Sequence, residues 1–335
     1  MIVAVSCVLL FALTLYALFG GADFGGGLWD LVAGGDRRGR APRKLIDESI
    51  TPVWEANHVW LIFALVIFWT AFPGAFAAVM TAAAIPLWLA VFGIVLRGAG
   101  FAFRKESETL RWQRLLGATF AFSSLVTPFF MGTVIGSIVA GKISPNARHA
   151  SLGVWTSPTS LLMGALFVVV CAYLAAIFLT REARRRHDES MLLYFSRRAE
   201  VAAVVAGLLS LSTLLELRHA NPVFFHGLTH RALALVVVAA LCGVVALALL
   251  ARQQATGLRL IAAIGVVCVV WGWGVAQYPL LLPGTSLTLA DGAAPRATLE
   301  AIVVLFVTAL VLVVPSFVIL FTLQGRQLLS SEETK

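Results

Sequence analysis

Two ionisable side chains stand close together at the start of a long apolar run, in the stretch 49–72. Glu55 and His58 are three residues apart, so a helix would place both on one face, together with Ile62. A carboxylate that enters membrane hydrocarbon costs about 3 kcal/mol on insertion scales, and it normally faces a cavity or a partner. We interpret Glu55 as a functional residue. The simpler alternative is a carboxylate at headgroup level, held by the positive end of the helix.

A second acid, Asp23, lies at the end of the first apolar run, between two groups of glycines. These glycines are expected to let the chain turn, and Gly21 and Gly25 also have the spacing of a close helix contact. Because Asp23 and Glu55 approach the membrane from the same side on neighbouring helices, they are predicted to share one inner cleft. Two such acids are typical of a proton path, since each can bind and release a proton. The alternative for Asp23 is a helix-end residue that makes turn hydrogen bonds.

Further side chains are interpreted as members or supports of the same site. His58 either joins the path or donates a hydrogen bond to Glu55. Arg97, at the end of the third apolar run, is either a surface anchor whose stem snorkels or the counter-ion of an inner carboxylate. Asn57 and Trp54 complete the supporting set. The helix that carries the second run is expected to begin at 51–52, because threonine caps helices and proline suits their first position.

The composition places these residues in a membrane. Of the 335 residues, 60% are hydrophobic and only 13% are charged, and the mean hydropathy is +0.92. Such a chain is predicted to be an integral membrane protein without an appended soluble domain. The net charge of +8 arises in short loops between apolar runs, so membrane topology accounts for it and no nucleic-acid partner is expected.

Neither cysteine nor histidine spacing predicts a metal site. The four cysteines lie singly inside apolar runs, without a CxxC pair, and are interpreted as packing residues. His219, His226 and His230 lie near Glu216, but their spacing leaves only two of them on one helical face. None of the six histidines lies deep in an apolar run, so no haem ligand is expected from this chain.

Nine apolar runs of about 20 residues, the length that crosses a membrane, predict an all-α polytopic protein with a single domain, 1–335. The spans cover approximately 2–22, 53–72, 76–98, 115–140, 158–180, 199–217, 229–251, 258–281 and 299–323. Of the 25 lysines and arginines, 20 belong to alternate loops and the C-terminal tail. By the positive-inside rule this places the N-terminus outside and the C-terminus inside.

Three blocks of this sequence together resemble subunit II of the cytochrome bd-type quinol oxidases. The blocks are 22–25 (ADFG), 52–61 (PVWEANHVWL) and the stretch from 278–279 (YP) through 286–289 (SLTL). The likeness extends through the whole chain in the number and order of spans, and the block 52–61 is the most specific.

The resemblance implies a fold of two four-helix bundles plus one peripheral helix, in a bacterial plasma membrane. It implies a heterodimer with subunit I, which carries haem b and haem d, or b-type variants, and oxidises quinol. This chain would then hold no redox centre. A bound quinone and a small accessory subunit occur in some members. The family's acids at the positions of Glu55 and Asp23 are associated with proton delivery towards the haems.

The sequence departs from the family pattern at four positions. Glu55 stands where aspartate is frequent, and His58 stands where glutamine is frequent. Gly20 replaces an additional acid of some members, and Phe321 replaces a common tyrosine. These departures suggest a divergent branch, with the cyanide-insensitive group as the candidate.

Three functions remain open at this stage. The first is a subunit of a quinol oxidase that reduces oxygen to water and draws protons from the cytoplasm. The second is a proton-coupled secondary transporter, which also uses intramembrane acids and broken helices. The third is a purely structural membrane partner, in which the acids only stabilise the bundle.

Overall fold

The computed structural model describes residues 1–335 except 36–37, 107–109, 255 and 326–335. Within α2, α4, α5 and α13 it leaves out the side chains of 50–56, 101–102, 104–106, 110–116, 313–314, 317–318 and 320–325. The helices are α1 Ile2–Leu31, α2 Arg40–Ala71, α3 Pro73–Ala82, α4 Ala84–Glu106, α5 Leu110–Val139, α6 Leu152–Trp155, α7 Pro158–Arg185, α8 Glu189–Ala220, α9 Pro222–His226, α10 Leu233–Ala251, α11 Leu258–Gln277, α12 Leu289–Gly292 and α13 Arg296–Gly325. A single π-helical turn, η1 Gly227–Arg231, lies between α9 and α10.

The all-α class is confirmed, and the described residues contain no strand beyond one isolated bridge between Leu280 and Thr288. Six helices in the described part of the chain are long and apolar enough to cross a membrane: α1, the part of α5 from Gly117, α7, α8, α10 and α11. The segment Asn57–Ala71 of α2 and the following helix α3 are bent by 118° relative to each other. If these two segments are counted as one broken span, the number of spans rises to seven. The structure therefore shows a multi-pass membrane protein with six or seven such spans.

The helix expected over 76–98 is interrupted, because α3 ends at Ala82 and α4 begins at Ala84. Pro86 explains the break. In one continuous helix Pro86 would lie in the interior, where it has no N–H to donate and its ring collides with the preceding turn. In the observed arrangement it lies in the first turn of α4, where the missing N–H is not needed.

The boundaries of the first two helices also differ from expectation. The glycine-rich stretch around Asp23 was expected to turn, but α1 continues through it to Leu31. Backbone groups inside a membrane must satisfy one another, which favours continued helix even through glycines. Likewise α2 begins at Arg40, not at Thr51, and its helical backbone runs without interruption through 50–56. Asp23 therefore lies inside a helix and not at its end.

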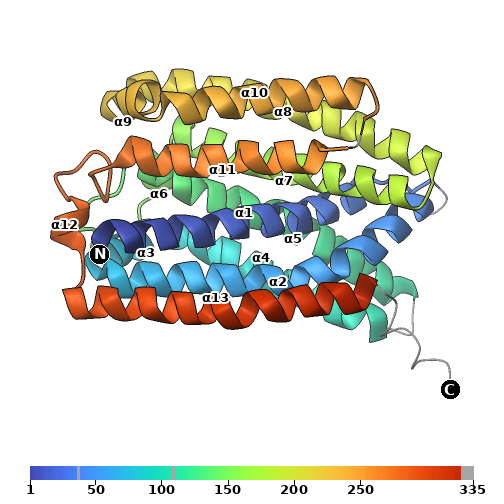
Figure 1. Ribbon diagram of the computed structural model, residues 1–335, viewed down its shortest axis with the longest axis horizontal. Coiled ribbons are helices and arrows are strands. Elements are labelled where there is room, and N and C mark those ends of the chain that lie inside the picture. The colour runs from blue at the N-terminus through green and yellow to red at the C-terminus, as the bar shows by residue number, and fades with distance from the viewer. Residues whose placement is uncertain (36–37, 107–109, 255, 326–335) are drawn as a thin grey trace.

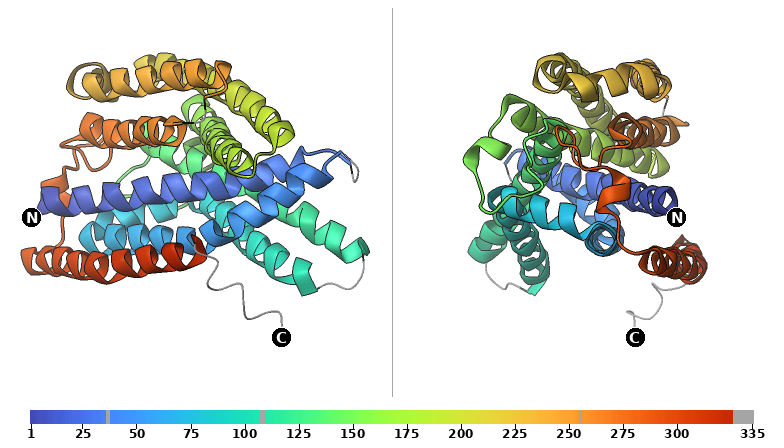
Figure 2. Two further views of the ribbon diagram at one scale, coloured as in Figure 1. Left: turned by 45° about the vertical axis from the view of Figure 1, so that its right-hand side comes forward. Right: turned by 90° about the vertical axis from the view of Figure 1, so that its left-hand side faces the viewer.

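The long helices run alongside one another and leave two distinct ends (Figure 1). The N-terminus and the short helices α6, α9 and α12 lie at one end, and the last described residues of α13 lie at the other. Figure 2 shows α13 along one side of the molecule, where it contacts α1 and α2. Helices α8 and α10 lie on the opposite side of the bundle.

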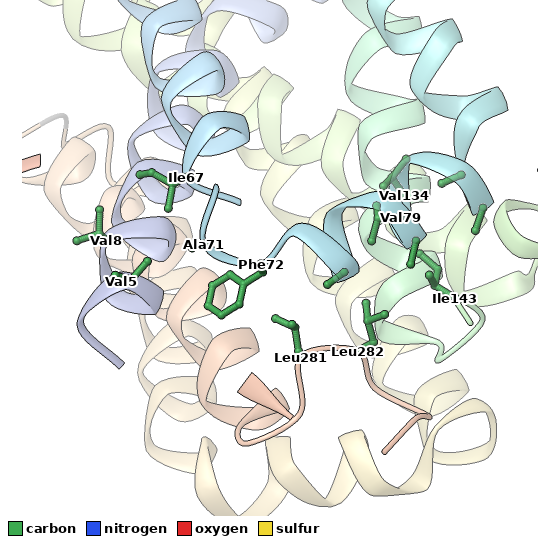
Figure 3. Close-up of a cluster of buried hydrophobic side chains, with 14 of the residues drawn as sticks. Val5, Val8, Ile67, Ala71, Phe72, Val79, Val134, Ile143, Leu281 and Leu282 are labelled. Atoms are coloured by element: carbon green, nitrogen blue, oxygen red, sulfur yellow. The ribbon is translucent and has the colours of Figure 1, made fainter. Parts of the chain in front are cut away.

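The largest apolar core lies at the end that holds the N-terminus (Figure 3). Val5 of α1, Phe72 at the bend between α2 and α3, and Leu282 of the loop before α12 are all fully buried there. The same end is fixed by polar contacts. Asn221 donates to the carbonyl of Val139 at 2.8 Å, and the backbone N–H of Ala294 donates to the carbonyl of Ala71 at 2.8 Å.

Candidate functional site

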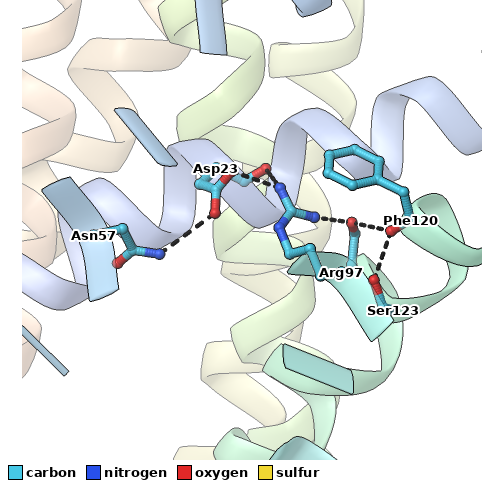
Figure 4. Close-up of polar contacts among 6 residues, drawn as sticks. Asp23, Asn57, Arg97, Phe120 and Ser123 are labelled. Carbon is cyan, nitrogen blue, oxygen red and sulfur yellow. Dashed lines mark hydrogen bonds and ion pairs between the residues drawn. The ribbon is translucent and has the colours of Figure 1, made fainter. Parts of the chain in front are cut away.

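A buried ion pair between α1 and α4 lies at the centre of the candidate site (Figure 4). One terminal nitrogen of Arg97, Nη2, is 2.5 Å from Oδ1 of Asp23 and also donates to the Asp23 backbone carbonyl at 2.8 Å. The two side chains are 0% and 1% exposed. Of the two alternatives for Arg97, the structure therefore has the counter-ion and not the surface anchor.

The rest of the Arg97 guanidinium is held by α5. Nη1 donates to the Ser124 hydroxyl, which in turn donates to the carbonyl of Phe120 at 2.7 Å. The guanidinium also lies over the Phe120 ring, 4.2 Å from its centroid, and 5.1 Å from the centroid of Phe24. Aromatic faces attract a desolvated cation, so hydrogen bonds and a ring contact from α5 and a second ring contact from α1 complete the ion pair.

Asn57 of α2 extends the cluster on the side of Asp23. Its side-chain nitrogen donates to the second carboxylate oxygen, Oδ2, at 3.5 Å, and the residue is fully buried. A Cβ added at Gly20 would lie 2.9 Å from the Asn57 side-chain oxygen. An acid at position 20, as in the family pattern noted above, would therefore require Asn57 to move.

Glycines of α1 allow the neighbouring helices to approach this pair. A Cβ at Gly25 would collide with the Cys171 carbonyl of α7, and a Cβ at Gly27 would collide with Ser124 and lie 2.9 Å from Arg97 Nη1. The expected close contact at Gly21 and Gly25 is confirmed, with Leu174 of α7 opposite Gly21. These glycines are contact residues, and the expected turn at this stretch does not exist.

The structure brings together three of the six residues predicted for the site: Asp23, Asn57 and Arg97. His58 follows Asn57 in α2 and is half-buried. The side chains of Trp54 and Glu55 lie outside the described residues, so the inner cleft expected for Asp23 and Glu55 stays a prediction.

Sequence reasoning missed Ser124, Phe120 and Phe24, the residues that surround the Arg97 guanidinium. Phe24 lies in the block 22–25, but nothing in the sequence marks its ring or Ser124 and Phe120 as contacts of Arg97, because one hydroxyl or ring in an apolar run is ordinary. Two of the histidines considered for a metal site, His226 and His230, stack with their ring centroids 3.8 Å apart at η1. Among the described residues, no group of three potential metal ligands is present.

Fold and site together define a class of protein: a helical membrane protein that keeps a charge pair inside its helical bundle. The family model for cytochrome bd terminal oxidase subunit II matches residues 1–324, so the chain belongs to that family. It is a multi-pass protein of a bacterial membrane.

Two curated relatives match over part of the chain. Subunit 2 of the cytochrome bd ubiquinol oxidase of Bacillus subtilis is 27% identical over 162 residues, which cover 48% of this chain and 47% of the relative. The cytochrome bd-I ubiquinol oxidase subunit 2 of Escherichia coli is 29% identical over 126 residues, covering 38% and 32%. The matched segments thus span about half the relatives' length or less.

The fold has a counterpart among solved structures. A chain in the structure of bd oxidase from Geobacillus thermodenitrificans superposes with a TM-score of 0.75, covering 96% of this chain and 97% of that chain. Its sequence identity is 24%, so this likeness establishes the fold and nothing further.

Proposed function

We propose that this chain is the haem-free subunit II of a quinol oxidase that reduces oxygen to water, in a heterodimer with a haem-bearing subunit I. Family membership supports the complex, and the relatives' names support quinol as electron donor. The histidines support a haem-free role. Five of the six have exposed side chains and His58 is half-buried, whereas an axial haem ligand is enclosed with the macrocycle. Redox catalysis would then reside in subunit I.

The proposed topology has nine spans in one domain, with the N-terminus outside and the C-terminus inside. The loops that connect α1 to α2 and α7 to α8, which are rich in arginine, lie at the same end of the bundle as the end of α13 (Figure 1). This common end is what the positive-inside rule requires of a cytoplasmic face. The C-terminal ends of α4 and α10 would lie on this face as well.

The second part of the proposal is a proton path from the cytoplasm through Glu55, His58 and Asp23. The observation that carries it is the fully buried Asp23–Arg97 pair with Asn57 beside it. Charged groups inside a membrane bundle are costly and usually mark an ion or proton route. Two buried atoms, Asn57 Oδ1 and Arg97 Nε, have no hydrogen-bond partner among the described residues. Buried polar atoms of this kind are normally satisfied by water, which supports a hydrated route.

The rival function is a purely structural role, which the tightness of the pair favours. Asp23 can take up a proton only if its interaction with Arg97 weakens, and that leaves a buried guanidinium without its counter-charge. In the proposed path, Glu55 and His58 therefore carry the proton between water and the pair. Asp23 and Arg97 then form its charged inner end.

The test compares single and paired substitutions in the complex purified from membranes. Asp23→Asn alone leaves Arg97 unpaired, so it should lower the yield of assembled complex whichever function is correct. The double variant Asp23→Asn/Arg97→Gln removes both charges and should restore the yield. If Asp23 belongs to a proton path, quinol-dependent oxygen uptake per haem stays at least about tenfold below wild type in the double variant, as for the loss of a proton-transfer group. Wild-type uptake per haem in the double variant would establish the structural role.

Glu55→Gln and Glu55→Asp complete this test. The glutamine variant should slow oxygen uptake per haem, and the aspartate variant should slow it less, because only aspartate can still relay a proton. A reduced-minus-oxidised absorbance spectrum of the same preparation shows whether a haem-bearing partner copurifies. If the chain purifies alone and catalyses proton-coupled solute flux in liposomes, the transporter function replaces the oxidase.

A further inference from the structure

A basic cleft lies between the end of α7, the start of α8 and the start of α11. Its volume is about 850 Å³, which falls in the range of about 300–1,000 Å³ typical of ligand sites. Four arginines and a histidine line it: Arg181, Arg184, Arg185, Arg259 and His187. Two acids, Asp188 and Glu189, lie in the same lining, so positive charge is in excess.

The arginines of this cleft differ in the number of ion pairs and hydrogen bonds that they make with other residues of the chain. Arg181 and Arg184 make no ion pair or side-chain hydrogen bond within the described part of the chain, and Arg185 has only Glu182, at 3.6 Å. Their neighbour Arg186 is turned elsewhere and pairs with Glu48 of α2 as well as Glu182. Burial opposes the charge of Arg186, but these two hydrogen bonds outweigh it and raise its pKa.

Arg259 brings a further positive group to the cleft. Its guanidinium lies 4.0 Å from the centroid of the Phe178 ring and donates to the Phe178 carbonyl at 3.0 Å. Its Nε is buried without a hydrogen-bond partner among the described residues. Gly257, which also lines the cleft, is the N-cap residue of α11 and makes no side-chain cap. An anion in the cleft would meet guanidinium forks that suit phosphate, and the N-terminal end of a helix.

The cleft also borders on apolar surface. Leu260 lines it and is 65% exposed, and Ile264, one turn further along α11, is 39% exposed. Leu192 of α8 lines it as well, although that side chain is buried. Basic groups at a membrane surface next to exposed leucine and isoleucine suit a molecule with phosphate at one end and hydrocarbon at the other.

We propose that this cleft binds a phosphate group, supplied by the headgroup of an anionic phospholipid whose acyl chains lie along α11. The chemistry shared with a free polyphosphate is recognition of phosphate oxygens by Arg181, Arg184 and Arg185. The apolar stripe at Leu260 and Ile264 distinguishes the two sources, because a free polyphosphate has nothing to place there.

The experiment measures the thermal midpoint of the delipidated protein, purified with any partner that accompanies it, from its tryptophan fluorescence. Phosphatidylglycerol or cardiolipin should raise the midpoint in a saturable manner, whereas phosphatidylcholine should not. Arg181→Gln/Arg184→Gln should lose at least half of this rise. Arg181→Lys/Arg184→Lys should fall between it and wild type, because lysine keeps the charge but not the fork. The matched control is Arg197→Gln/Arg252→Gln, two exposed arginines outside the cleft lining, which should retain the full rise.

The other outcomes show whether the phosphate group belongs to a lipid and whether the cleft is a binding site at all. If pyrophosphate alone raises the midpoint of wild type, and does so less in the glutamine variant, the site binds phosphate but the lipid source is overturned. If the anionic lipid acts equally on both glutamine pairs, or if the rise never saturates, the cleft is not a site. Raising the salt concentration should weaken the lipid effect, since exposed charges are screened.

Discussion

Arg97 and Arg184 are the same residue type in two opposite situations. Arg97 is fully buried, and its guanidinium finds a carboxylate, a hydroxyl, a backbone carbonyl and two aromatic rings inside the chain. Arg184 is exposed at a helix end and has no ion pair among the described residues. The buried arginine is satisfied by its own protein, whereas the exposed one is available to a second molecule. Each could be removed by a single substitution, and the consequences should differ accordingly.

The largest effect is expected from Arg97→Gln, which leaves the carboxylate of Asp23 buried without its counter-charge. Breaking one partner of a buried pair costs about 3–5 kcal/mol, enough to prevent stable folding of many domains. Arg184→Gln is the matched substitution and should change stability by less than about 0.5 kcal/mol. The yield of folded protein and its thermal midpoint in detergent measure both. Equal loss in the two variants would contradict the distinction between the buried and the exposed arginine.

The next effect concerns the close packing that encloses the pair. Gly25→Ala would place a methyl group against the Cys171 carbonyl of α7 and within 2.7 Å of the Ala175 Cβ, so α1 and α7 must separate. Overpacking of this kind costs about 1–3 kcal/mol. Gly207→Ala in α8 is the control, because a Cβ there meets nothing within 4 Å and alanine favours helix. The thermal midpoint of Gly207→Ala should equal or exceed that of wild type. A fall as large as that of Gly25→Ala would contradict the contact role of Gly25.

The sequence predicted the kind of fold better than the partners inside it. Apolar runs and the proline at 158 are local signals, and α7 begins at Pro158 as expected. The pairing of Asp23 with Arg97 joins residues 74 positions apart and depends on how closely two helices approach. From the local sequence alone, a run of glycines predicts a turn. In a membrane bundle the same glycines instead allow close contact between helices. The end of α1 at Leu31 was missed for that reason. The break between Ala82 and Ala84 was missed as well, although the helix-breaking effect of Pro86 is a local signal.

A third arginine lies between the two extremes and should give an intermediate effect. Arg43 Nε donates to Asp30 Oδ1 at 2.7 Å, and the two side chains are 28% and 7% exposed. This pair joins the end of α1 to the start of α2. Arg43→Gln should cost about 1 kcal/mol, near the upper end for pairs that water still reaches and well below the cost for Arg97. If Arg43→Gln costs as much as Arg97→Gln, burial does not set the order of the three arginines.

The smallest effect is expected from an acid of the cleft, and it depends on pH. Asp188 caps α8: its carboxylate accepts hydrogen bonds from the Ser190 hydroxyl at 2.7 Å and from the Met191 backbone N–H at 3.0 Å, and these bonds lower its pKa. A lowered pKa in the folded state means that the ionised cap stabilises the protein fully above the unfolded pKa of about 4. This contribution is then lost as the pH falls through the folded value.

Asp188→Asn keeps a capping oxygen that does not titrate, so it isolates this contribution, which is about 1 kcal/mol or less for a helix cap. The difference in thermal midpoint between wild type and Asp188→Asn should be constant from pH 7 to pH 5 and should shift against wild type below about pH 4. A difference that stays constant down to pH 3 would show that the Asp188 charge does not contribute to stability. Asp23 offers a contrast with this exposed acid, because its carboxylate is enclosed and paired with Arg97 inside the bundle. The two aspartates thus repeat the difference between the two arginines: one charge is satisfied inside the bundle, and the other remains in exchange with its surroundings.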